Sequence, residues 1–153
     1  MEVLLDEHSF VRCTLIRPVE DHSRWSNRVI VVSSIFAGFG VAHLIDDFLF
    51  GVPAEFNLSN PPTQFLALAF FVALTGLIAL AARGTRASYQ GLITIGLLLA
   101  LADTLKHIPE IVGSVSYRSG TASMVFAIGL IVSGLATALV SWFALRQQGT
   151  IHP

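Results

Sequence analysis

The sequence predicts an all-α integral membrane protein, an up-down four-helix bundle with both termini in the cytoplasm. Three observations lead to this prediction. Hydrophobic residues make up 54% of the 153-residue chain and charged residues only 12%, with a mean hydropathy of +0.72; a soluble domain carries roughly 25% charged residues. The hydrophobic residues gather in four long runs separated by short polar segments. Lys and Arg are concentrated in alternate polar segments.

Each run is close to the ~20 residues that cross a ~30 Å hydrocarbon core as a helix. Backbone polar groups in lipid must be hydrogen-bonded within their own segment, so these runs are expected to be helical. Short connections make consecutive helices antiparallel neighbours. We expect one transmembrane domain over residues 29–146, with helices at about 29–50, 65–82, 91–112 and 122–145.

The polar segments give the expected orientation. Residues 1–28 contain four Arg and no signal-peptide pattern, so we expect a cytoplasmic tail with a short interfacial helix near its start. Arg83, Arg86 and Arg146 lie on the same side, whereas Arg118 is the one basic residue between runs on the other side. This asymmetry places residues 147–153 in the cytoplasm as well and predicts a multi-pass protein of the cell membrane.

Composition and motifs exclude several classes of function. The formal net charge is −1, so no basic surface is expected to bind nucleic acid. Cys13 is the only cysteine, which excludes an internal disulfide and a metal site built from cysteines. The sequence has neither a phosphate loop nor a Rossmann fingerprint, so no nucleotide cofactor is expected. The expected partner is membrane lipid, and small-residue helix faces also suit a homo-oligomer.

Two of the apolar runs carry ionisable residues where hydrocarbon is expected. Helical spacing places three of these on one face of each run: His43, Asp46 and Asp47 in the first, and Asp103, His107 and Glu110 in the third. His43 lies 14 residues past Val29 and Asp103 lies 12 past Gly91, which puts both roughly 18–21 Å from the cytoplasmic side at the helical rise. We therefore predict that the two groups meet in the outer half of the bilayer.

Imidazole and carboxylate together favour Zn, Fe or Mn, so these six residues are predicted to bind a divalent metal. Lys106, Tyr117 and Arg118 are expected to lie around the ligands, with Lys106 near enough to pair with Asp103 or Glu110. The four carboxylates and Lys106 leave a formal charge of −3 within the membrane, which requires protonation, a bound cation or a water-filled cleft. An ionisable group inside a membrane costs free energy unless another charge, a hydrogen bond or water stabilises it, and such groups usually have a function.

Four interpretations of this cluster remain open at the level of sequence. The first is a metal site, which either catalyses a reaction of a lipid or other hydrophobic substrate or transports the metal. The second is a proton or cation relay in a carrier. The third is a pocket for a small ligand or lipid headgroup, and the fourth is a set of structural ion pairs. The sequence contains no nucleophile motif that decides whether the protein is an enzyme.

Two further features make predictions about the helices themselves. Pro109 either kinks the third helix or marks its end. Small residues recur at helical spacing as Ser34 and Gly38 in the first run and as Gly96 and Ala100 in the third. Such stripes allow close helix packing in lipid, so both are predicted to face inward and to bring the ionisable groups with them.

Overall fold

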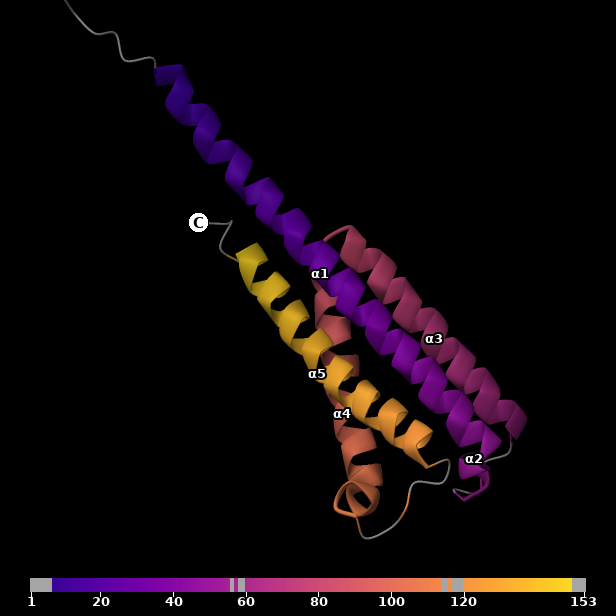
Figure 1. Ribbon diagram of the computed structural model, residues 1–153. Helices are drawn as coiled ribbons and strands as arrows, with labels where there is room; N and C mark the ends of the chain where they lie inside the picture. Colours follow the sequence, from indigo (N-terminus) through magenta and orange to yellow (C-terminus); the bar gives the residue numbers. More distant parts are fainter. Residues whose placement is uncertain (1–6, 56, 58–59, 114–115, 117–119, 150–153) are drawn as a thin grey trace, which may run out of the picture.

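The computed structural model is all-helical and describes residues 7–55, 57, 60–113, 116 and 120–149, with side chains for these except residues 7–23, 55, 60, 111 and 149. Four long helices lie along one another, and a short helix, α2, lies beside the end of α1 (Figure 1). The helices are α1 (Glu7–Leu49), α2 (Val52–Glu55), α3 (Asn60–Ala82), α4 (Arg86–Ile111) and α5 (Thr121–Gly149).

The four long helices each contain a segment long and apolar enough to cross a membrane, which confirms the prediction of four such helices. The shortest segment, Pro61–Ala82, has 22 residues and therefore extends about 33 Å. Two helices begin about five residues before the apolar run does. In α3 the reason is Pro61 and Pro62, whose fixed φ suits the first turn of a helix and whose missing N–H groups cost nothing there.

The first helix is much longer than its apolar run. It begins at Glu7, so the polar segment before Val29 is helical over most of its length, where the sequence predicted only a short interfacial helix. A helix nucleated in the membrane extends at little further cost because each added residue gains one backbone hydrogen bond. The 43 residues of α1 span roughly 65 Å, and its N-terminal half extends past the other helices (Figure 1).

The helix α5 packs along both α1 and α4. Small residues permit this contact: a Cβ atom on Gly96 would lie 2.6 Å from the backbone oxygen of Gly134. The inward stripe predicted for the third run is thus confirmed. The stripe predicted for the first run is wrong, because Ser34 is exposed and the Cβ position of Gly38 has no described neighbour within 4 Å beyond its own stretch of helix. The glycine of α1 that faces the bundle is Gly40.

The helix α3 is the most peripheral of the four, with only 11% of its apolar segment buried. It packs on α1 and α4 through residues that include Leu74 and Ala81, whereas Leu66, Leu68 and Val72 are largely exposed. Exposed apolar side chains on a spanning helix are suited to contact with lipid tails. A cleft lies between α3 and its neighbours α1 and α4.

Candidate metal centre

The HLIDD segment lies near the C-terminal end of α1. His43 and Asp46 are buried, with 5% and 8% of their surface exposed. Asp47 is partly buried, with 21% of its side chain exposed. The three residues share a helix face because they are three and four positions apart. His43 and Asp46 therefore point into the bundle, as predicted. The stripe of Ser34 and Gly38, which was expected to point the same way, faces outward instead.

The second group lies in the last turns of α4. Asp103 and His107 are 7% and 6% exposed and stand one turn apart on the buried face. Pro109 lies inside the helix, which continues to Ile111. The proline thus precedes the end of α4 by only two residues, and α4 stays helical through His107.

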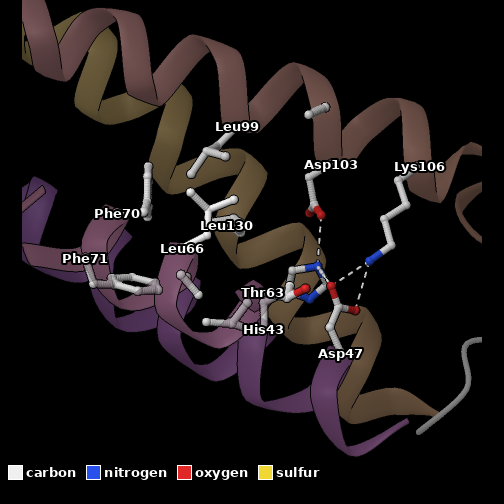
Figure 2. A pocket seen from close by; sticks show the side chains of 14 residues that line it. His43, Asp47, Thr63, Leu66, Phe70, Phe71, Leu99, Asp103, Lys106 and Leu130 are labelled. Carbon is white, nitrogen blue, oxygen red and sulfur yellow. Dashed lines mark hydrogen bonds and ion pairs between the residues drawn. The ribbon is translucent and has the colours of Figure 1, made fainter. Parts of the chain in front are cut away.

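The two groups meet, as the sequence predicted. The Nε2 atom of His43 lies 2.9 Å from Oδ1 of Asp103, and Nε2 of His107 lies 3.6 Å from the same oxygen. The two imidazole rings are edge to face with their centroids 5.3 Å apart. Figure 2 shows His43 rising from α1 toward Asp103 on α4. The shared carboxylate oxygen therefore lies between two imidazole rings.

These three side chains have the arrangement of a ligand set. One donor atom from each of His43, Asp103 and His107 lies within 4.8 Å of the other two. Metal–ligand bonds of about 2.0–2.2 Å separate neighbouring donors by roughly 3 Å or slightly more, so the observed distances need little adjustment. Two imidazoles and one carboxylate suit Zn, Fe or Mn, and three protein ligands leave coordination positions open.

Two of these side chains, His43 and Asp103, carry polar atoms without a hydrogen bond to any described residue. Among the described residues, neither ring nitrogen of His43 has a hydrogen-bond partner, and neither does Oδ2 of Asp103. The 2.9 Å contact between His43 and Asp103 is thus a close approach without hydrogen-bond geometry. An unpaired polar group in an apolar interior costs roughly 1–3 kcal/mol, and more for a charge. A cation between the rings and the carboxylate would remove this cost.

Lys106 pairs across the helix interface instead of along its own helix. The sequence placed it near Asp103 or Glu110, but its Nζ atom donates to both carboxylate oxygens of Asp47 on α1, at 2.9 and 2.7 Å. Asp47 Oδ2 also lies 3.8 Å from Nε2 of His43. The ion pair therefore neutralises Asp47 beside the buried ligand set and ties α1 to α4.

The remaining predicted ligands occupy the margins of this set. Asp46 accepts a hydrogen bond from the hydroxyl of Ser123 on α5, so it faces a different helix from His43. Glu110 Oε2 lies 3.7 Å from Nδ1 of His107, on the side of the ring away from Asp103. A carboxylate in that position is typical of residues that orient a metal-binding imidazole. Tyr117 and Arg118 lie outside the described residues.

A cleft of about 540 Å³ opens beside the ligand set, between α1, α3 and α4 with one residue from α5. His43, Asp47, Asp103 and Lys106 form its polar end, and Figure 2 shows aromatic and aliphatic side chains along the rest of it. The apolar walls include Leu66, Phe70, Phe71, Leu99 and Leu130. Such a volume is ordinary for a small-molecule site, for which the range is roughly 300–1,000 Å³.

Sequence reasoning did not find the cleft residues of α3 or the role of Ser123. Phe70 and Phe71 lie in an uncharged run with no local signal that separates a cleft-facing position from a lipid-facing one, and Thr63 precedes the start predicted for that run. Ser123 is one of several serines and threonines on α5, and its pairing with Asp46 depends on how the two helices are rotated.

Comparison with known proteins identifies no family for this chain. No protein-family model matches the chain, and no curated protein and no solved structure shows detectable similarity to it. The chain itself shows four helices apolar enough to span a membrane and a buried group of two histidines and an aspartate that could hold a metal ion.

Proposed function

We propose that this protein binds one divalent cation inside the membrane, between α1 and α4, through His43, Asp103 and His107. The observation that carries the proposal is the convergence of three buried donor groups, of which His43 has both ring nitrogens without a hydrogen-bond partner among the described residues. A structural polar cluster would satisfy these atoms by hydrogen bonds, because an unpaired buried polar group is costly.

Charge supports the same proposal. Asp46, Asp47, Asp103 and Glu110, with Lys106, carry a formal charge of −3 when ionised. Each charged residue at the centre of a spanning helix costs about 2.5–3.5 kcal/mol even on the mildest insertion scales. One divalent cation reduces the formal charge to −1. Its place beside Asp103 would put the positive charge where the two neutral imidazoles offer lone pairs.

We infer an up-down topology with both termini in the cytoplasm, which places the metal site near the outer leaflet. Ser26 contacts Tyr89 near the start of the two spans, and His43 contacts Asp103 near their ends, so α1 and α4 run in the same direction. At the opposite end from the site, Arg28 lies over Trp25 and Arg146 over Trp142. Aromatic and basic residues of this kind are typical of a cytoplasmic membrane interface.

The ligand set favours a membrane-embedded metalloenzyme over a purely structural metal site. Three protein ligands leave coordination positions free, and the cleft ends at His43 and Asp103. A bound divalent metal would supply Lewis acidity to a molecule entering that cleft. Lys106 and Asp47, paired at the polar end, would keep the local charge balanced while a lipid or other hydrophobic substrate binds.

Metal content of the purified full-length protein tests the proposal. We expect about one Zn, Fe or Mn per chain in the wild type and at least a tenfold loss of affinity in His43→Ala and His107→Ala. The matched control is His22→Ala, which removes a histidine from the polar part of α1. Absence of stoichiometric metal from the wild type, before and after reloading with each of these metals, would contradict the proposal.

A further inference from the structure

The cleft has two chemically distinct parts. Its polar end consists of His43 and Asp103, flanked by the ion pair of Asp47 with Lys106. Away from that end, the side chains that line it are apolar on α3 from Leu66 to Phe71 and on α4 at Leu99, as Figure 2 shows, whereas Thr63 lies near His43. These walls comprise Leu66, Ala67, Phe70, Phe71, Leu99 and Leu130. A cleft with one polar end and one long apolar arm matches an amphiphilic molecule.

We propose that this cleft binds a single-chain amphiphile with a neutral oxygen head, a hydroxyl or carbonyl, placed at the metal and with its hydrocarbon tail between α3 and α4. This inference rests on the proposed metal site, because the open coordination positions hold the head. Beyond the metal site, it specifies the class of molecule that binds and the charge of the head group of that molecule.

The packing of α3 gives the tail a route from the bilayer. Leu66 lines the cleft and is 72% exposed, and Ala102 on the facing helix also lines the cleft and is exposed. The cleft is thus open along the side of the bundle that lipid would cover. A hydrocarbon tail that moves from lipid into an apolar cleft gains little from the move itself, since lipid is equally apolar. Selectivity must therefore come from the head.

The charges of the wider cluster disfavour an anionic head. Lys106 is the one cationic residue among the described residues that line the cleft, and both oxygens of Asp47 already engage its ammonium group. With one divalent metal bound, the wider cluster keeps a formal charge of −1, because Asp46 and Glu110 lie just outside the cleft lining. A carboxylate or phosphate head would add negative charge to an acidic site in a medium of low dielectric constant.

A cationic head is disfavoured for a different reason. An ammonium group has no lone pair to donate to a metal, and it would approach a divalent cation of like charge. Hydroxyl and carbonyl oxygens offer a lone pair without a net charge. Such oxygens are ligands that Zn, Fe and Mn accept in open coordination positions.

The test uses the metal-loaded full-length protein in detergent and measures saturable binding of tritiated hexadecanol. We expect about one molecule per chain, and at least tenfold weaker competition by hexadecanoate and by hexadecyltrimethylammonium than by unlabelled hexadecanol. Removal of the metal by a chelator should weaken hexadecanol binding at least tenfold. Equal binding with and without metal, or preferential binding of hexadecanoate, would overturn the inference.

A matched pair of variants tests the tail. Ala67 lines the cleft, whereas Ala69 lies two positions further on the same helix, is exposed and does not line the cleft. Ala67→Phe should fill the arm and reduce hexadecanol binding at least tenfold with unchanged metal content, and Ala69→Phe should leave both unchanged. Unchanged metal content also shows that the variant is folded.

The outcomes separate the two proposals. Stoichiometric metal without hexadecanol binding overturns this inference and leaves the metal site intact. A wild-type protein that takes up no metal removes both. Equal effects of Ala67→Phe and Ala69→Phe would show that hexadecanol binds the lipid-facing surface and would overturn the placement of the tail.

Discussion

The two ends of the α1–α4 interface bury polar groups in opposite ways. Near the start of the two spans, the hydroxyl groups of Ser26 and Tyr89 lie 2.8 Å apart in a hydrogen bond, and both residues are buried. Near the other end, His43 and Asp103 are equally buried, but His43 has no hydrogen bond to any described residue. The first contact involves neutral groups that satisfy each other. The second involves ionisable groups that do not.

This difference separates a packing contact from a site. A neutral hydrogen-bonded pair in a membrane interior costs little and fixes how two helices fit together. An unsatisfied ionisable cluster costs stability, so its persistence points to a bound partner that is charged. On this account the Ser26–Tyr89 end stabilises the bundle, whereas the His43–Asp103 end destabilises it in the absence of metal and serves to bind the metal.

The substitution Asp103→Asn tests this difference between the two ends with the largest expected effect. Without metal, the substitution removes a buried charge that has an unpaired oxygen, so we expect the free energy of unfolding to rise by about 1–2 kcal/mol. Zn²⁺ at one hundred times its dissociation constant should stabilise the wild type by about 2.7 kcal/mol and the variant hardly at all. Thermal unfolding in detergent, followed by circular dichroism, measures both effects.

A destabilised Asp103→Asn protein in the absence of metal would support the structural ion pair instead. In that case a protonated His43 would be held by Asp103, and the loss of the carboxylate would leave an uncompensated buried cation. Equal stabilisation of the variant and the wild type by Zn²⁺ would place the metal elsewhere.

Lys106→Met tests the ion pair at the edge of the site. The variant leaves the carboxylate of Asp47 without its cation, and we expect a loss of about 2 kcal/mol in unfolding free energy, typical of charge-assisted hydrogen bonds. The double variant Asp47→Asn, Lys106→Met should recover most of this loss. Arg146→Met, which removes an exposed contact of that cation with Trp142 at 4.0 Å, serves as the control and should cost about 0.5 kcal/mol.

If Lys106→Met cost no more than Arg146→Met, the pairing of Lys106 with Asp47 would contribute no more than a surface contact. Its role beside the ligand set would then need another explanation.

The smallest expected effect is at the satisfied end. Tyr89→Phe removes the hydrogen bond with Ser26, worth about 0.6 kcal/mol in a membrane protein, and a long one of 3.5 Å to the backbone oxygen of Ala81 on α3. Metal content should stay at the wild-type value, because the change lies at the far end of the interface. A drop in metal content as large as that of His43→Ala would show that the two ends are not independent.

Much of the fold could be predicted from the sequence, because the length and hydropathy of a run determine whether it can span a membrane. The meeting of His43 with Asp103 was also predictable. Helical spacing placed each group on one face, and counting residues from the helix starts placed both groups at one depth.

What could not be predicted depends on the rotation of each helix about its axis. A lipid-exposed helix is apolar all round, so hydropathy does not mark its inner face. The stripe through Ser34 and Gly38 was therefore assigned to the wrong side, whereas Ser33, Phe36 and Gly40 are buried. The pairings of Asp46 with Ser123 and of Lys106 with Asp47 follow from the same rotations and have no signature along the chain.

X-ray absorption spectroscopy at the metal edge of the loaded protein tests the central claim most directly. The account predicts two imidazole nitrogens and at least one carboxylate oxygen at about 2.0–2.2 Å from the metal, and the loss of one imidazole in His107→Ala. A spectrum with no imidazole scattering, or one that is identical in the wild type and His107→Ala, would contradict a metal site built on α1 and α4.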